Sequence, residues 1–207
     1  MSEVWFADPE VLEDLRTYVT RARSLDADGA IRLQSSGMAL AAYVGVLPGR
    51  GLMSTGAIMG LRVVALAEPA DLDVTVSLAS VTERLARGAT STLTIPTTTV
   101  RVEWAAMAPP RSGWEPVGSI SAADLKTIAT EGIAEIAHSV PQDSGAHAVA
   151  AVRQRVWSRD TQTTPPITSG AAFAAYALGF LNHGSARVLA HGRWTRLSTE
   201  TGHILVR

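Results

Sequence analysis

The chain of 207 residues is 46% hydrophobic and 18% charged, which excludes a disordered protein and indicates a buried core. It has no cysteine, so disulfides and thiolate metal sites are excluded. The net charge of −1 is unevenly distributed. Residues 1–144 hold 11 basic and 17 acidic side chains (−6), and residues 145–207 hold 7 and 2 (+5). We expect the basic end to dock an acidic partner, and the acidic half of the chain itself is one candidate.

The first element expected along the chain is a helix. Asp8-Pro9 is typical of a helix start, and apolar residues recur at helical spacing up to Ala22. Strands are then predicted at 31–34, 38–47, 60–67 and 72–78, a helix at 80–88 after a capping box, and a strand at 100–104. Short strands with tight connections favour an antiparallel sheet over parallel βαβ units.

The composition changes in the Pro-rich stretch that follows, so we predict domains at 1–108 and 121–207 joined by a linker at 109–120. The second part is expected to hold three helices, at 121–140, 145–157 and 170–181, and then a hairpin of strands 191–198 and 203–207. The fold class is therefore α+β: an N-terminal helix with an antiparallel sheet, followed by a three-helix segment and a C-terminal β-hairpin. The sequence leaves open whether the two parts share one core.

No catalytic motif is present. The glycine-rich stretch 45–51 lacks the spacing of a dinucleotide or phosphate loop, and Ser54 lacks the glycines of a nucleophile elbow. The five histidines are not at metal-ligand spacing. The sequence therefore predicts no cofactor and no metal, and it favours a protein that is not an enzyme.

Two groups of residues are candidates for binding. Trp114 in the linker either anchors an interface or folds back over the sheet, and Phe173, Tyr176 and Phe180 lie on an apolar helix that a second subunit could cover. A pocket for an anionic ligand could be formed by Arg50, His191, Arg193 and Arg196.

These features favour a non-catalytic intracellular protein that acts through association, chiefly as a homo-oligomer. The first alternative is a binder of an anionic small molecule, or an enzyme without a recognisable motif. The second is a nucleic-acid-binding protein with a winged-helix-like C-terminal part. Helix 170–181 argues against the second alternative, because it carries no charged or amide side chain to read a groove.

Four segments carry a family resemblance: Trp114-Glu115, the run from Gly170 to Ala175, the run from Gly192 to Thr199, and the ending Gly202 to Arg207. In these the chain resembles a family of uncharacterised actinobacterial proteins. The resemblance implies a bacterial cytoplasmic origin but no activity, cofactor or site. A cytoplasmic location also agrees with a start that lacks a signal-peptide pattern, and with a longest apolar stretch (38–48) shorter than the roughly 20 residues of a membrane span.

Overall fold

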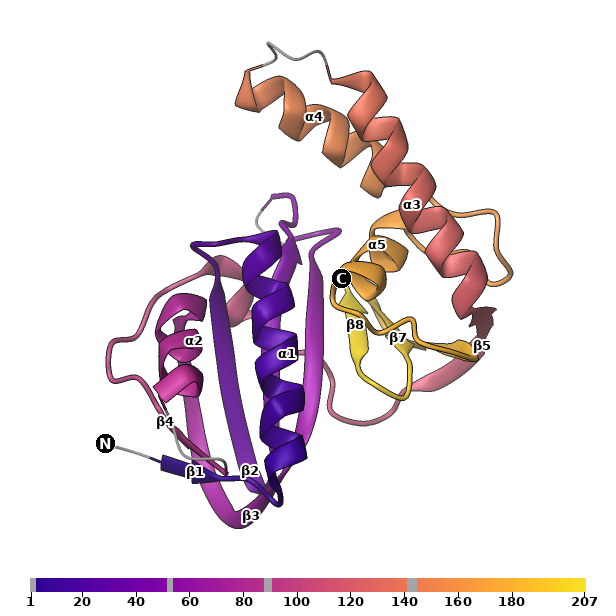
Figure 1. Ribbon diagram of the computed structural model, residues 1–207. Helices are drawn as coiled ribbons and strands as arrows, with labels where there is room; N and C mark the ends of the chain where they lie inside the picture. The colour runs from indigo at the N-terminus through magenta and orange to yellow at the C-terminus, as the bar shows by residue number, and fades with distance from the viewer. Residues whose placement is uncertain (1–2, 52–53, 88–90, 141–144) are drawn as a thin grey trace. The chain divides into compact units, whose positions relative to one another are not determined.

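A computed structural model describes residues 3–51, 54–87, 91–140 and 145–207 (Figure 1). Helices and antiparallel strands both occur, which confirms the α+β class. The chain divides into two compact units. Unit 1 contains Met1–Pro48 and Met59–Ala108, and unit 2 contains Gly49–Ile58 and Pro109–Arg207. In the described ranges no helix is both long and apolar enough to cross a membrane.

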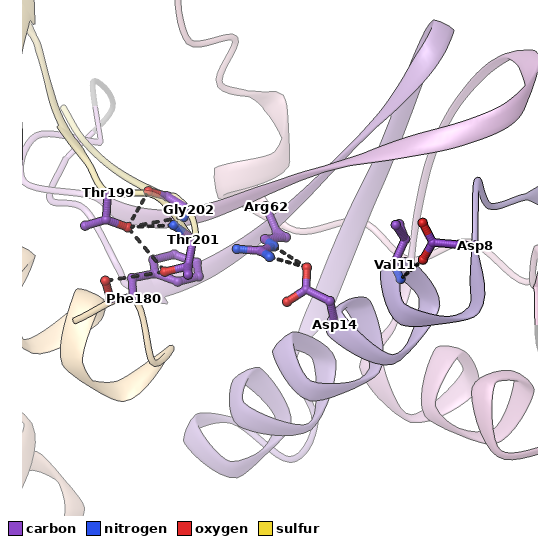
Figure 2. Close-up of polar contacts among 8 residues, drawn as sticks. All are labelled: Asp8, Val11, Asp14, Arg62, Phe180, Thr199, Thr201 and Gly202. Carbon is purple, nitrogen blue, oxygen red and sulfur yellow. Dashed lines mark hydrogen bonds and ion pairs between the residues drawn. The ribbon is translucent and has the colours of Figure 1, made fainter. Parts of the chain in front are cut away.

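Unit 1 is built from two helices and four strands. Its elements are β1 (Glu3–Trp5), α1 (Pro9–Leu25), β2 (Ala30–Leu47), β3 (Ile58–Ser77), α2 (Leu78–Arg87), β4 (Thr92–Thr94) and the 3₁₀ helix η1 (Glu103–Ala106). The predicted start of α1 is confirmed, because the Asp8 carboxylate accepts a hydrogen bond of 2.9 Å from the Val11 amide (Figure 2). Its apolar stripe is buried at Leu12, Leu15, Tyr18, Val19 and Ala22.

Two long strands replace the four that the sequence predicted. After the buried Ala30 at the start of β2, the buried positions fall on odd numbers from Ile31 to Ser35 and on even numbers from Leu40 to Val44, with Ser36 to Ala39 exposed between them. Gly37 has φ +66°, a conformation that glycine adopts without strain. The shift in parity is what a β-bulge produces, and it interrupts the apolar alternation while the backbone continues as one strand.

Unit 1 is held together by contacts between elements distant in sequence. The Arg62 guanidinium of β3 pairs with the Asp14 carboxylate of α1 (Figure 2). Trp104 does not lie on a strand, as the sequence predicted, but in η1 against β2. A Cβ atom at Gly45 would lie 2.6 Å from its indole ring, so this position requires glycine.

Unit 2 contains an antiparallel four-stranded sheet in the order β8-β7-β6-β5. The strands are β5 (Glu115–Ser121), β6 (Ser185–His191), β7 (Trp194–Ser198) and β8 (His203–Val206). Strand β5 occupies part of the expected linker at 109–120, and its exposed residues gave no buried alternation to signal it. The predicted strand 191–198 is β7 alone, because β6 ends at the tight turn after His191. Strand β5 pairs with β6, so the sheet contains a strand from before the three helices in addition to the strands of the C-terminal hairpin.

Three helices complete unit 2: α3 (Ala122–Ser139), α4 (Ala146–Trp157) and α5 (Ser169–Ala177). The prediction that the segment from residue 170 is buried is confirmed, because Gly170 to Ala175 are all buried. Trp157 at the end of α4 stacks on Phe173 of α5, with ring centroids 4.4 Å apart and an angle of 19° between the rings. The same indole lies over Gly132 of α3, where a Cβ atom would be 2.3 Å from it.

The predicted turn between β7 and β8 is also confirmed (Figure 2). The Thr199 hydroxyl accepts hydrogen bonds from the amides of Thr201 and Gly202, at 3.3 and 3.2 Å. The Thr201 hydroxyl donates to the Phe180 carbonyl at 3.4 Å. The Phe180 ring leaves no room for a Cβ atom at Gly202, so the turn closes over that ring.

Replacing Gly132 by alanine tests the contact between Trp157 and α3. Alanine favours a helix over glycine by about 0.5–1 kcal/mol, whereas overpacking costs about 1–3 kcal/mol. Because the new methyl group would meet the Trp157 ring, which is also stacked on Phe173, we expect Gly132→Ala to lower the free energy of unfolding in urea by about 1–2 kcal/mol.

The exposed position Ala134 supplies the control, since Ala134→Gly reports the propensity effect alone. In the double variant Gly132→Ala/Trp157→Phe the smaller ring should recover part of the loss. A Gly132→Ala protein more stable than the wild type would show that the indole does not occupy this position.

Candidate functional site

The sheet of unit 2 has two chemically different faces. Helix α5 packs against β8 and α3 against β5. The side chains on one face of the sheet are apolar and buried, as packing against an apolar helix such as α5 requires. They belong to residues 186 and 188 of β6, 197 of β7 and 204 of β8. Alternation and strand register put the other set on the opposite face, which we call the arginine face: Arg187, Leu189 and His191 of β6, Trp194, Arg196 and Ser198 of β7, and His203, Leu205 and Arg207 at β8.

Three arginines form a diagonal across this face. Arg187 lies opposite Ser198, and Arg196 lies opposite Leu189 and Leu205. Arg207 follows two residues after Leu205. Arg187 and Arg196 are therefore diagonal neighbours on adjacent strands, as are Arg196 and Arg207. Residues in this i, j±2 relation are about 7–8 Å apart.

Arg196 is the central residue of the arginine face. Its guanidinium carbon lies 4.7 Å from the centroid of the Trp114 ring, a cation–π geometry. Its Nε atom is buried and has no hydrogen-bond partner among the described residues. Burial lowers the pKa of Arg196 from its ordinary value, and the neighbouring charge of Arg187 lowers it further.

Trp114 is fastened to this face by the loop that carries it. The indole N–H donates to the Pro110 carbonyl at 2.9 Å, and the ring meets the His191 imidazole edge-on at 6.0 Å. His191 Nδ1 lies 2.8 Å from the Gly113 carbonyl oxygen, so this nitrogen donates. Gly113 has φ +76° and leaves no room for a Cβ atom beside His191. The structure therefore brings together Trp114, His191 and Arg196, which are far apart in sequence.

The other two predicted ligand residues do not join this cluster. Arg193 is exposed in the turn between β6 and β7, and no described residue pairs with it. Arg50 is exposed in the segment 49–58, where its backbone pairs with Thr55. Within the described ranges, no hydrogen bond, ion pair or ring contact connects either side chain to Trp114 or Arg196.

The aromatic residues considered for an interface are largely covered by their own chain. Phe173 stacks on Trp157, and Phe180 lies beneath Gly202. Tyr176 alone of the three is exposed, at 37%. The apolar character of α5 is thus accounted for within unit 2 and does not by itself call for a second subunit.

The arginine face offers charge and hydrogen-bond donors rather than bond-breaking chemistry. Ser198 Oγ lies 3.0 Å from His203 Nδ1, but Ser198 is 3% exposed, so a substrate does not reach the hydroxyl. In the part of the chain described, no three His, Asp or Glu side chains group as metal ligands. The sequence did not single out Arg187, Arg207 and Trp194 as site residues. They join Arg196 on one face only because β6, β7 and β8 pair in this register.

Comparison with solved structures identifies the fold. The chain is similar over 100% of its length to the DNA polymerase III subunit beta of Pseudomonas aeruginosa, with a TM-score of 0.57 and 10% identity. It is similar over 99% to a putative DNA polymerase III beta subunit of Eubacterium rectale (TM-score 0.60, 7% identity). It is similar over 100% to the DNA polymerase sliding clamp of Caulobacter crescentus (TM-score 0.57, 7% identity). The chain spans 64%, 64% and 65% of these three chains, respectively.

No curated protein matches the chain. Residues 109–207 match the family described as Domain of unknown function (DUF8185), and residues 1–106 match Domain of unknown function (DUF8010). The resemblance to an uncharacterised family is thereby confirmed, while the actinobacterial origin stays a prediction. Because the second match extends over half of the sequence, the chain belongs to the DUF8010 family, with a DUF8185 domain after it.

Proposed function

We propose that this protein acts without catalysis, through association, and that it associates with copies of itself. The observation that carries the proposal is the likeness of the whole chain to sliding clamps, which are named as subunits of DNA polymerase III. The likeness concerns the fold, so association is our inference for this chain.

The charge of the two units supports the same proposal. Unit 1 holds 12 acidic and 8 basic side chains, a formal charge of −4, and unit 2 holds 7 and 10, a formal charge of +3. Opposite charges on two units of one chain favour contact between unlike units of two copies, and they disfavour contact between like units.

Sedimentation velocity tests the proposal. Over about 1–100 µM in low salt we expect the sedimentation coefficient to rise with concentration, toward a dimer or larger species. We expect added NaCl to weaken the association, because exposed charges are screened within about 10 Å at 0.1 M. A monomer at every concentration and salt would contradict self-association.

Binding to DNA is the second candidate, and it is favoured by the similarity to DNA polymerase clamps together with the positive charge of unit 2. Helix α4 carries Arg153 and Arg155, both exposed. Side chains of this kind bind phosphates without reading sequence.

Fluorescence anisotropy with a labelled 30-base-pair duplex tests this candidate. The affinity should fall linearly on a log–log plot against salt, with a slope of about −0.9 for each phosphate neutralised. If both arginines contact phosphates, the variant Arg153→Gln/Arg155→Gln should flatten that slope by about 1.8. Exposed Arg21 and Arg23 on α1 of unit 1, with the same spacing on a helix, supply a matched double variant. Absence of binding at 20 mM salt would remove the candidate.

A further inference from the structure

The arginine face carries positive charge that the chain does not neutralise. Among the described residues, Arg187, Arg196 and Arg207 take part in none of the ion pairs. The acid on the adjacent strand, Glu115, lies opposite Ala190, whose side chain belongs to the other face. Two like charges side by side, Arg187 and Arg196, repel each other unless an anion comes between them.

The position of the Arg196 guanidinium is fixed before any anion binds. Its guanidinium lies on the Trp114 ring, and the indole is fixed by its bond to the Pro110 carbonyl. A guanidinium whose plane is fixed presents its N–H donors in a rigid fork, which matches the two oxygens of a carboxylate. The Nε donor is buried, so a docked carboxylate is expected to meet the terminal Nη donors of the guanidinium.

We propose that the arginine face docks an acidic segment of a partner protein, bound in extended conformation with carboxylates at positions i and i+2. Alternate side chains of an extended strand lie on one side about 6.6–7 Å apart. That spacing matches the diagonal separation of about 7–8 Å between Arg187 and Arg196. The half-exposed Trp114 ring beside them would receive an apolar side chain of the same segment. The inference deepens the proposed function, because it names a partner for association.

The same observations favour a peptide over a nucleic acid. Bases bind single-strand sites by stacking on free aromatic rings. One face of the Trp114 ring is covered by Arg196 and its edge by His191, and Trp194 is only 8% exposed. The arginine face therefore offers at most the uncovered side of one ring, Trp114, where single-strand sites stack successive bases on several rings, and three arginines are few for a phosphate track.

Fluorescence anisotropy on the full-length protein tests the proposal. The probe is a fluorescein-labelled ten-residue peptide of alternating Glu and Leu, and the reference probe is the same peptide with Gln at every Glu. We expect the Glu peptide to bind at least tenfold more tightly than the Gln peptide. Arg196→Gln should weaken binding of the Glu peptide about tenfold, because a hydrogen bond to a charged group is lost.

Arg21→Gln is the matched control, since it makes the same charge change at an exposed site on α1 of unit 1. It should leave peptide binding unchanged. The indole N–H resonance of Trp114, assigned by its loss in Trp114→Phe, should shift on titration with the Glu peptide. Equal binding of the two peptides, an equal effect of both arginine variants, or a Trp114 resonance that does not move would each overturn the proposal.

Two further outcomes would assign the face to another occupant and also overturn the proposal. One is a ten-nucleotide oligothymidine that binds more tightly than the Glu peptide and depends on Arg196. The other is a loss of concentration-dependent sedimentation in Arg196→Gln, which would place a second copy on the face. A wild-type protein that binds the Glu peptide through Arg196 yet sediments as a monomer would refute self-association and leave the docking site standing.

Discussion

The stacking of Trp157 between α3 and α5 is the contact on which the organisation of unit 2 depends. The indole stacks on the Phe173 ring of α5 and closely approaches Gly132 of α3, so a single side chain of α4 joins three helices. Its position lets the nearly uncharged helix α5 be covered by residues of its own unit. A larger side chain at position 132 would push the Trp157 ring away from α3 or from Phe173, because a packed interior has no spare volume.

Helix α5 packs on one face of the sheet, so the arginine face is the one that α5 does not cover. In β6, β7 and β8, apolar residues that face the helices alternate with residues of the arginine face, which include the three arginines, two histidines and Trp194. Three positive charges on adjacent strands destabilise a sheet unless their charge is screened or matched. The chain keeps Arg196 in place with an aromatic ring rather than an acid, which leaves its charge available to an external carboxylate.

The sequence predicted those features that depend on residues close together in the chain. The cap at Asp8, the apolar stripe of α1, the buried helix after residue 170 and the turn at Thr199 all follow from residue type and spacing, and the structure confirms them. Long-range signals were weaker. Strand β5 is exposed on most of its residues, so no periodicity marks it, and the shift in burial parity around Gly37 makes one strand look like two in the sequence. The arginine face is likewise a product of register. His191, Arg196 and Trp114 were recognisable as candidates, but Arg187 and Arg207 join them only through the pairing of β6, β7 and β8.

Hydrogen–deuterium exchange of the 207-residue chain, with and without an acidic peptide, tests most directly the claim that α5 is buried on one face of the sheet of unit 2 while the arginine face binds acidic segments beside the loop of Trp114. The account predicts that amides of residues 171–175 exchange slowly in both states. It also predicts that the loop at 110–114 exchanges fast alone and slowly with the peptide. Rapid exchange along α5 without peptide, or protection that appears on α5 and not at the loop, would contradict it.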